Sequence, residues 1–475
     1  MLEENRRPGD PGWRNGISAG PGDLGLYAST ESARPGDRVE VHAASSTRSR
    51  GVVEVFRLGD YRGAGARRMW TDESAQLGPQ PICAVQPGTA LVECDWPTTT
   101  AFTVAPDWLS GVYVIKVRRQ DGVRSFTPFV VRDGRSAEIL LQTTFTTDQA
   151  YNRWGGESLY EDFSGTMPNG RATQVSFNRP YGDADGLGRF AWQVLDFIQF
   201  IERAGYDVTY ASNLDFLREP HLLGRVGALV IAGHDEYWPR EERAQVDAAL
   251  SGGTSLAYFG ANGGYWRIRL GPDAQGRPLR TITCFKGVEG DPQPGSTVRY
   301  RDPPDPHPEN AIFGVMYGSY MILSFPLVIA DASSWVFAGT GLRNGDRLLD
   351  LVGTEFDDLH DNGLTPPGTL IPAASPVITA ESRPGVARMA IRELPGGGIV
   401  FAAGTIDWAR GLSADPAVHD GRVERITRNV LERALAQVRP PLPLPPVGDG
   451  GPTEPAPDGS WAKRVEALAG TEGAA

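Results

Sequence analysis

Short alternating runs of hydrophobic and polar residues fill the chain from Gly25 to about Arg132. Examples are Arg38–His42, Val52–Phe56 and Gly111–Val117, and turn residues such as Gly, Pro and Asp separate the runs. Alternation with a period of two residues is typical of half-buried antiparallel strands. About seven such runs within roughly 110 residues favour an immunoglobulin-like β-sandwich.

After Asp133 the pattern changes to longer elements in which strands and helices alternate. The apolar run Val226–Ala232 is continuous, as in a central parallel strand that is buried on both faces. The rhythm predicts a doubly wound α/β domain, flavodoxin-like or glutamine-amidotransferase-like. The expected strands are 137–142, 206–210, 226–232 and 254–259, and the expected helices are 189–204, ending at Gly205, and 239–250, beginning at Pro239.

The remaining pattern completes an α+β multidomain organisation. We expect an N-terminal arm over 1–20, the sandwich over 21–134, the α/β domain over 135–438 and a Pro-rich flexible tail over 439–475. Within the α/β domain, further strands are predicted at 299–301, 314–317, 377–379, 386–392 and 399–403, a last helix at 421–438, and long loops at 271–312 and 338–375.

Composition narrows the class of protein. The 475 residues carry a net charge of −12, which argues against a large basic face for nucleic acid. The first 16 residues lack the apolar segment of a secretory signal, and no apolar run reaches the ~18 residues of a membrane span. We therefore expect a cytoplasmic protein with no membrane partner. Only three of the 46 basic residues are Lys, a bias typical of bacterial genomes rich in G and C.

The three cysteines form no zinc-binding pattern. Cys83 and Cys94 lie eleven residues apart, and a disulfide between them would require export to an oxidising compartment. Two reduced, partly buried thiols fit the expected location better, and we favour them.

Candidate chemistry begins directly after the central strand, with the sequence Gly233–Trp238. In open α/β sheets, ligands bind beyond the carboxyl ends of the strands. In an extended backbone, His234 and Glu236 point to the same side, where they could bind a metal or transfer protons. The alternative is a solvated turn, and the strand-end position favours a functional site.

Three further loops from the same edge of the sheet, at 143–160, 176–181 and 259–266, are rich in Tyr, Trp, Asn and Gly. Aromatic packing beneath loops explains many such clusters. The same residues could instead form an aromatic cleft for carbohydrate or peptide, so a non-catalytic binding protein is one alternative.

An ordered set of short sequences resembles the large (beta) subunit of N,N-dimethylformamidase and its relatives over roughly residues 20–438. The sequences are Val55–Gly65, Ala150–Gly156, Asn178–Tyr181, His234–Trp238, Gly260–Trp266 and Gly404–Trp408.

The resemblance implies a mononuclear Fe(III) site in an enzyme that hydrolyses the C–N bond of a small-molecule amide. Carried to this chain, it places the metal ligands at Tyr151, Tyr181 and Glu236, and the assisting residues at His234 and Glu355. The neighbouring Asn152, Trp154 and Asn262 become candidates for substrate binding. A separate small partner subunit is implied as well, and the long loops with their aromatics also favour a homodimer.

The chemistry of these residue types agrees with the resemblance. Two phenolates and one carboxylate would offer three anionic oxygens to a hard cation and leave positions for water and substrate. A phenol, with an ordinary pKa near ~10, stays deprotonated at neutral pH only beside a strong Lewis acid. A hydrolase without metal, in which His234 and Glu236 relay protons, is the remaining alternative.

Overall fold

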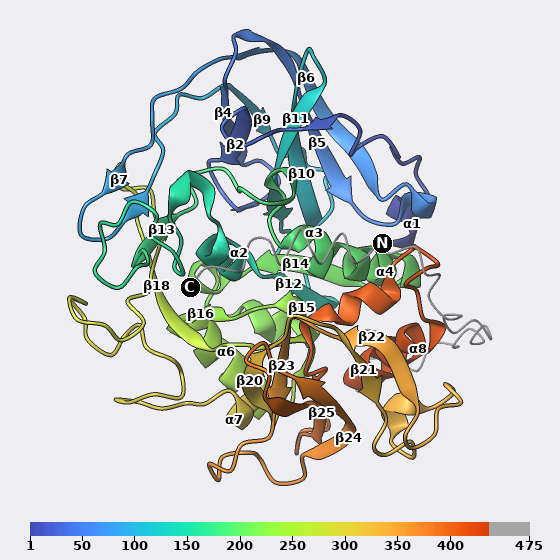
Figure 1. The fold of residues 1–475 in the computed structure, drawn as a ribbon. Coiled ribbons are helices and arrows are strands. Elements are labelled where there is room, and N and C mark those ends of the chain that lie inside the picture. The colour runs from blue at the N-terminus through green and yellow to red at the C-terminus, as the bar shows by residue number, and fades with distance from the viewer. Residues whose placement is uncertain (437–475) are drawn as a thin grey trace.

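The computed structural model describes residues 1–436, which form a multidomain α/β protein built mostly of sheets (Figure 1). The end of the last predicted helix and the predicted tail, including Pro440–Pro457, lie outside the described residues.

Two sheets pack against each other in the N-terminal part of the chain. Their shared core contains Val41 and Phe102 from one sheet and Val55, Ile115 and Phe129 from the other. The immunoglobulin-like class of this sandwich stays a prediction. The larger sheet has the order β1 (Ile17–Ser18), β11 (Val123–Val131), β10 (Gly111–Arg119), β5 (Ser49–Leu58) and β6 (Ala66–Leu77), with β3 (Ser32–Ala33) also paired to β11, and the smaller has the order β2 (Leu24–Ala28), β4 (Arg38–Ser45) and β9 (Thr100–Thr103).

A seven-stranded sheet forms the centre of the second part. Its first five strands are parallel, and each of the last two pairs antiparallel with the strand before it. The doubly wound class stays a prediction, although the four early strands expected from the sequence all lie in this sheet. The order is β14 (Val208–Ser212), β12 (Ala137–Thr143), β15 (Val226–His234), β17 (Ser255–Ala261), β26 (Ile399–Ala402), β25 (Pro384–Glu393) and β24 (Leu370–Ile378).

Helices cover both faces of this sheet because its strands are apolar on both sides. On one face, Val230 shares a buried cluster with side chains of α4 (Leu195–Ala204) and α8 (Gly421–Leu435). On the other face, Leu229 shares a cluster with Val246 of α6 (Arg240–Ser251). Figure 1 shows α3 (Phe190–Gln193) and α4 between the sandwich and the large sheet.

The predicted helix over 189–204 is two helices, since the backbone breaks at Val194 between α3 and α4. Gly205 ends α4 as expected, with a φ of 83° that suits glycine. Pro239 precedes α6 as its N-cap and belongs to β16 (Tyr237–Pro239), so the predicted helix begins one residue later.

The two segments predicted to be long loops contain short helices and strands, so the prediction of loops over their full length was wrong. The strands Thr281–Thr283 and Glu355–Asp358 are too short to show the hydrophobic period that identifies a strand. The predicted strand at 299–301 is also wrong, because only Arg299 forms an isolated bridge, to Trp266. The elements within the two segments are β19 (Thr281–Thr283), α7 (Asn310–Phe313), β22 (Arg347–Val352), β23 (Glu355–Asp358) and the start of β24.

The remaining elements are small. Besides β16 and β19, they comprise α1 (Leu2–Asn5), α2 (Phe145–Tyr151), α5 (Asp215–Arg218), β7 (Val85–Gln86), β8 (Leu91–Val92), β13 (Gln174–Ser176), β18 (Trp266–Gly271), β20 (Met316–Tyr320) and β21 (Phe325–Val328).

Cys83 and Cys94 form a disulfide, so the favoured prediction of two reduced thiols was wrong. The β7–β8 hairpin folds the intervening segment back on itself and brings the two Cα atoms to 4.8 Å. This separation is within the range that a disulfide spans. The compartment of the protein stays a prediction.

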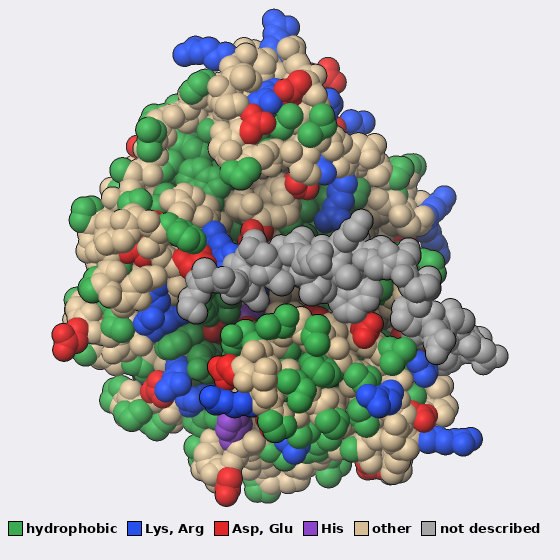
Figure 2. Space-filling model, viewed as in Figure 1, with side chains coloured by type: hydrophobic (Ala, Val, Ile, Leu, Met, Phe, Trp, Pro, Cys, Tyr) green, Lys and Arg blue, Asp and Glu red, His purple; other side chains and the backbone are tan. Residues whose placement is uncertain are grey.

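Within residues 1–436, no helix combines the length and apolar character needed to cross a membrane. On the face seen in Figure 2, basic and acidic side chains are interspersed and do not gather into one broad basic patch. This distribution agrees with the net negative charge of the chain.

A buried ion pair joins the sandwich to the α/β part. Arg57 on β5 donates to both carboxylate oxygens of Glu202 on α4, at 2.8 and 2.6 Å, and both side chains are fully buried. Asn5 and Tyr210 also donate to this carboxylate, at 2.8 Å each. With the charges paired and the carboxylate oxygens hydrogen-bonded, the pair fixes the contact between the two parts.

We predict that Glu202→Gln lowers the free energy of unfolding by about 3–5 kcal/mol, because it leaves the Arg57 charge buried without its partner. Urea denaturation measures this change. The matched control is Glu393→Gln, which breaks the solvent-exposed pair with Arg433 and should cost less than about 1 kcal/mol. Equal effects of the two substitutions would contradict the role assigned to the buried pair.

Candidate functional site

The candidate site lies at the carboxyl edge of the large sheet, where three neighbouring parallel strands end. His234 is the last residue of β15, and Asn262 directly follows β17, the next strand in the sheet. Tyr151 is the last residue of α2, which begins two residues after β12. Glu355 comes from β23, outside this sheet.

The carboxylate of Glu236 accepts hydrogen bonds from two phenols. The Tyr151 hydroxyl donates to Oε2 at 2.8 Å, and the Tyr160 hydroxyl lies 2.8 Å from both oxygens. The two rings stack with their centroids 4.3 Å apart. Three oxygens of the types that bind hard cations therefore converge at one point.

The backbone around Glu236 is fixed from both sides. The Thr147 hydroxyl on α2 accepts the N–H groups of Glu236 and Tyr237, at 2.9 and 3.2 Å. The Glu236 carbonyl accepts the N–H groups of Tyr265 and Trp266, at 2.8 and 2.9 Å. These bonds hold the carboxylate without using its own oxygens.

His234 and Glu355 form a second pair beside this carboxylate. The Nε2 atom of His234 lies 3.4 Å from Oε2 of Glu355 and 3.6 Å from Oε2 of Glu236. The Asn262 amide donates to Oε2 of Glu355 at 2.8 Å. Asp357, two residues along β23 from Glu355, accepts the Asn262 backbone N–H at 2.8 Å.

Asp235 points away from these groups, as the alternation of an extended chain requires. Its carboxylate accepts hydrogen bonds from Gln142 at 2.6 Å, Asn213 at 3.0 Å and Trp238 at 2.7 Å. Gln142 and Asn213 also donate to Glu242 on α6. This buried network anchors the segment from which His234 and Glu236 extend to the other side.

Two cations flank the stacked phenols. The guanidinium carbon of Arg189 lies 3.9 Å from the centroid of the Tyr151 ring. The ammonium of Lys286 lies 3.5 Å from the centroid of the Tyr160 ring. Since each ring already stacks on the other, the cations occupy the two outer faces, where they attract the rings' negative faces.

Burial dominates the titration of the site. It raises the pKa of Glu355 to about 8, and the Glu236 carboxylate adds to that shift. It also raises the pKa of Glu236 and holds the pKa of Tyr151 and Tyr160 well above the usual value for tyrosine. Without a bound cation, both phenols therefore keep their protons at neutral pH.

The pKa values of the basic groups are lowered, because burial disfavours their charged forms. The pKa of His234 falls well below its ordinary value, through burial and through the Arg189 charge. Burial also lowers the pKa of Lys286 to about 8, against the attraction of Glu236. The imidazole is therefore neutral at pH 7.

The donor set fits a hard trivalent cation. Among the described residues, no group of three or more His, Cys, Asp and Glu side chains is arranged to hold a metal. Tyrosine supplies the missing donors at Glu236, where two phenolic oxygens and a carboxylate lie within hydrogen-bonding distance. The buried Nδ1 of His234 has no hydrogen-bond partner among the described residues.

The structure brings together five of the residues singled out from the sequence: Tyr151, His234, Glu236, Asn262 and Glu355. Tyr181 has no hydrogen bond to Glu236 among the described residues. The charges acting on its phenol are those of Asp148, Glu31, Arg280 and Arg179.

The Asn152 side chain forms hydrogen bonds within the turn around it, and Trp154 contacts the N-terminal part. The Asn152 amide donates to Gln149 and to the Pro180 carbonyl, and its oxygen accepts the Trp154 and Gly182 N–H groups. The Trp154 ring packs edge-on against Trp96 of the N-terminal part.

Tyr160, Lys286 and Arg189 join the site without having been singled out from the sequence. Tyr160 ends the aromatic segment 143–160, so its position nine residues after Tyr151 was a usable signal. Lys286 is one of only three lysines in the chain, and it lies in the predicted long loop at 271–312.

Comparison with known proteins identifies the family. The model of the family described as "N,N-dimethylformamidase beta subunit-like, C-terminal" matches residues 52–421. The chain therefore belongs to this family, as the sequence resemblance predicted.

The curated N,N-dimethylformamidase beta subunit of Alcaligenes sp is 22% identical over 425 residues, which cover 73% of this chain and 55% of that protein. This chain thus spans about half the length of the relative.

Two solved structures that match part of the chain do so at TM-scores too low to define the fold. An uncharacterized protein from Bacillus anthracis str. Ames is 11% identical, with a TM-score of 0.15 over 22% of this chain and 79% of its own. The sporulation control protein Spo0M from Bacillus subtilis is 13% identical, with a TM-score of 0.15 over 24% of this chain and 50% of its own.

We predict that the metal-free protein loses stability as the pH rises from about 4 through 8. Burial raises the pKa of Asp148 to about 8, although the Arg189 charge opposes the shift. The folded state then binds this proton more tightly than the unfolded chain. The stabilisation is complete below the unfolded pKa and disappears as the pH passes the folded pKa.

Asp148→Asn should make the dependence of the melting temperature on pH visibly flatter between pH 5 and 8. Asp107→Asn, at an exposed position, should leave it unchanged. An unaltered slope in Asp148→Asn would refute the assignment.

Proposed function

We propose that this protein hydrolyses the C–N bond of a small-molecule amide at a mononuclear Fe(III) site. The observation that carries the proposal is the convergence of two phenols on one buried carboxylate, with a second acid–base pair beside it. Membership of the dimethylformamidase beta subunit-like family supports the same chemistry.

Glu236, Tyr151 and Tyr160 are the residues that would hold the iron. Tyr160 takes the place that the sequence resemblance gave to Tyr181, because its hydroxyl contacts the carboxylate. When bound, ferric iron would polarise the amide carbonyl and make a water molecule more acidic. Loss of both phenolic protons on binding would leave three anionic oxygens, a set that suits a hard trivalent ion.

His234 and Glu355 would move the protons of the reaction. At neutral pH the imidazole can accept a proton, and Glu355, with a pKa of about 8, can donate one. Their atoms Nε2 and Oε2 are 3.4 Å apart, so a proton taken from water by His234 stays within reach of Glu355. Glu355 would then protonate the leaving amine nitrogen.

Asn262 and Lys286 would orient and balance these groups. The Asn262 amide donates to Glu355 at 2.8 Å, which fixes the direction of its carboxyl group. The positive charge of Lys286 would stabilise the negative charge that the deprotonated phenols and Glu236 carry. Among the residues first expected to bind substrate, Asn262 is the one next to the acid–base pair.

The identity of the amide and the assembly of the enzyme belong to the proposal as well. The relative named above is a beta subunit, so we expect a partner subunit for this chain too. Because this chain corresponds to about half of that relative, we infer only the class of reaction and no specific substrate.

Purified protein loaded with Fe(III) should show a visible tyrosinate-to-iron charge-transfer band. We predict that Tyr151→Phe and Tyr160→Phe each weaken the band and lower amide hydrolysis by at least about tenfold, since each removes one anionic oxygen. Tyr181→Phe is the matched control and should leave the band unchanged. Absorption spectroscopy and elemental analysis measure both effects.

A protein that binds no iron, or a band that survives in both Tyr151→Phe and Tyr160→Phe, would overturn the proposed site. A band weakened in Tyr151→Phe and Tyr181→Phe but unchanged in Tyr160→Phe would instead restore the ligand set expected from the sequence.

Glu236→Gln separates the metal-dependent mechanism from a metal-free proton relay. We predict that this variant loses bound iron and activity together, because the amide removes the anionic oxygen and keeps the volume. Elemental analysis and a hydrolysis assay on the same sample test this. Iron retained at full occupancy with activity lost would favour a general-base role for Glu236.

A further inference from the structure

Arg179 is buried beneath the turn that carries the two phenols, and all five of its N–H donors are used. Nε donates to the Gln149 side-chain oxygen at 3.1 Å. The other four bonds end on backbone carbonyls, those of Gln149 (3.4 Å), Asn152 (2.8 Å), Trp154 (3.1 Å) and Glu157 (2.7 Å).

The position of these carbonyls explains why an arginine is needed. They belong to the end of α2 and to the irregular turn that follows, where carbonyls have no partner within the helix. Among the described residues, none of the hydrogen-bond partners of Arg179 is a carboxylate. The guanidinium therefore serves the backbone path of residues 149–157.

This path sets where the two phenols lie. Tyr151 ends α2, and the chain returns to it through a bond from the Leu159 N–H to the Ala150 carbonyl, at 3.0 Å. The return places Tyr160 beside Tyr151 with the rings stacked. A change in the turn between them would move one phenol relative to the other.

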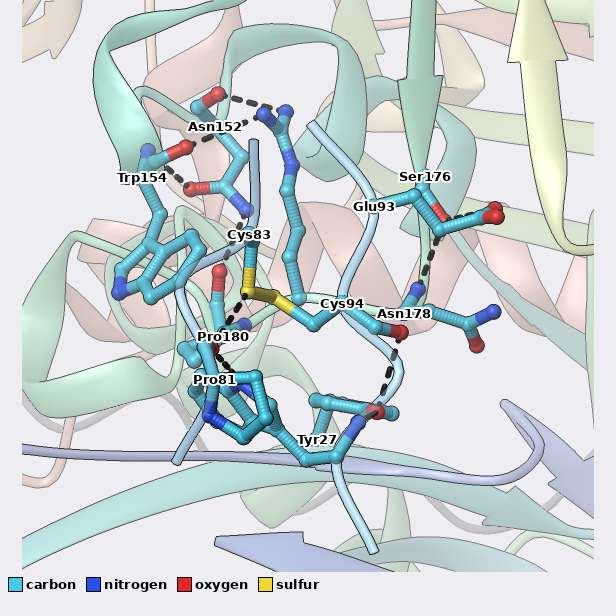
Figure 3. Close-up of a disulfide and its surroundings, with 12 residues drawn as sticks. Tyr27, Pro81, Cys83, Glu93, Cys94, Asn152, Trp154, Ser176, Asn178 and Pro180 are labelled. Atoms are coloured by element: carbon cyan, nitrogen blue, oxygen red, sulfur yellow. Dashed lines mark hydrogen bonds between the residues drawn. A yellow bond between two sulfur atoms is a disulfide. The ribbon is translucent and has the colours of Figure 1, made fainter. Parts of the chain in front are cut away.

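The strand segment that leads to Arg179 contacts the disulfide-closed segment of the N-terminal part. The Cys94 N–H donates to the Asn178 carbonyl at 2.8 Å, and the Ser176 hydroxyl donates to Glu93 at 3.1 Å. Figure 3 shows the disulfide with Asn178 on the Cys94 side and with Asn152, Trp154 and Pro180 on the Cys83 side.

We propose that Arg179 is a positioning residue, whose five hydrogen bonds fix the turn 149–157 and so set the spacing of the Tyr151 and Tyr160 hydroxyls at Glu236. The link to iron rests on the function proposed above, whereas the link to the turn does not.

The first test uses metal-free protein. Arg179→Lys keeps the charge but offers only three donors, so it cannot reproduce the fork. Hydrogen–deuterium exchange should show at least tenfold faster exchange of amides in 145–163 in this variant than in the parent.

Arg280→Lys is the matched control. Arg280 is also buried and lies in the same region, but it donates to Glu31, Ala28 and Asn178, and none of these partners, within residues 1–436, belongs to the turn 149–157. It should leave exchange in 145–163 unchanged. Equal acceleration in both variants, or none in Arg179→Lys, would overturn the proposal.

The second test adds Fe(III) to the same variants. Arg179→Lys should weaken iron binding by about 10- to 100-fold and shift the charge-transfer band, with Arg280→Lys close to the parent. If the parent itself binds no iron, the proposed function fails and the exchange result still decides the role of Arg179. If Arg179→Lys exchanges faster but keeps the charge-transfer band and iron affinity of the parent, the claim that Arg179 sets the positions of the two phenols is refuted.

If Arg179→Lys does not unfold cooperatively, Gln149→Leu replaces it. That variant removes the side-chain oxygen that accepts from Nε of Arg179 and from the Asn152 amide, and it keeps the other four bonds of Arg179. It should accelerate exchange in the same segment by a smaller factor. Unchanged exchange in folded Gln149→Leu would count against the proposal.

Discussion

The removal of the Glu236 carboxylate from water is the constraint on which the site depends. A buried carboxylate needs partners for its oxygens, and here two phenols supply them. Both phenols keep their protons while no cation is present, because burial and the Glu236 charge raise their pKa. The arrangement is thus one carboxylate hydrogen-bonded by two neutral phenols, which on the proposed function a trivalent cation would convert into three anionic oxygens.

The scaffold holds this set through contacts that lie outside it. Thr147 fixes the backbone at Glu236, and the Asp235 network anchors the same segment on the opposite side. Arg179 fixes the turn between the phenols, and the disulfide-closed segment of the N-terminal part bonds to Asn178 and Ser176, just before Arg179 in the chain. The N-terminal part therefore contributes to the geometry of the site although none of the site's polar groups comes from it.

The sequence predicted the structural features that a regular hydrophobic period or the end of a strand determines. The strand 226–232 and the position of His234 and Glu236 beyond it follow from such patterns. Other features depend on contacts between distant segments, which one sequence does not reveal. Glu355 lies on a short polar strand inside a segment expected to be a loop, and the choice of Tyr160 over Tyr181 follows from the backbone bond between Leu159 and Ala150. The reduced state expected of Cys83 and Cys94 rested on compartment alone, and the hairpin between them decided otherwise.

The central claim is that a metal ion binds between the oxygens of Glu236, Tyr151 and Tyr160. The most direct measurement is an anomalous difference map at the iron absorption edge from crystals of the iron-loaded protein. The account predicts one strong peak within bonding distance of all three oxygens. A peak at another set of residues, or no peak at saturating iron, would contradict it.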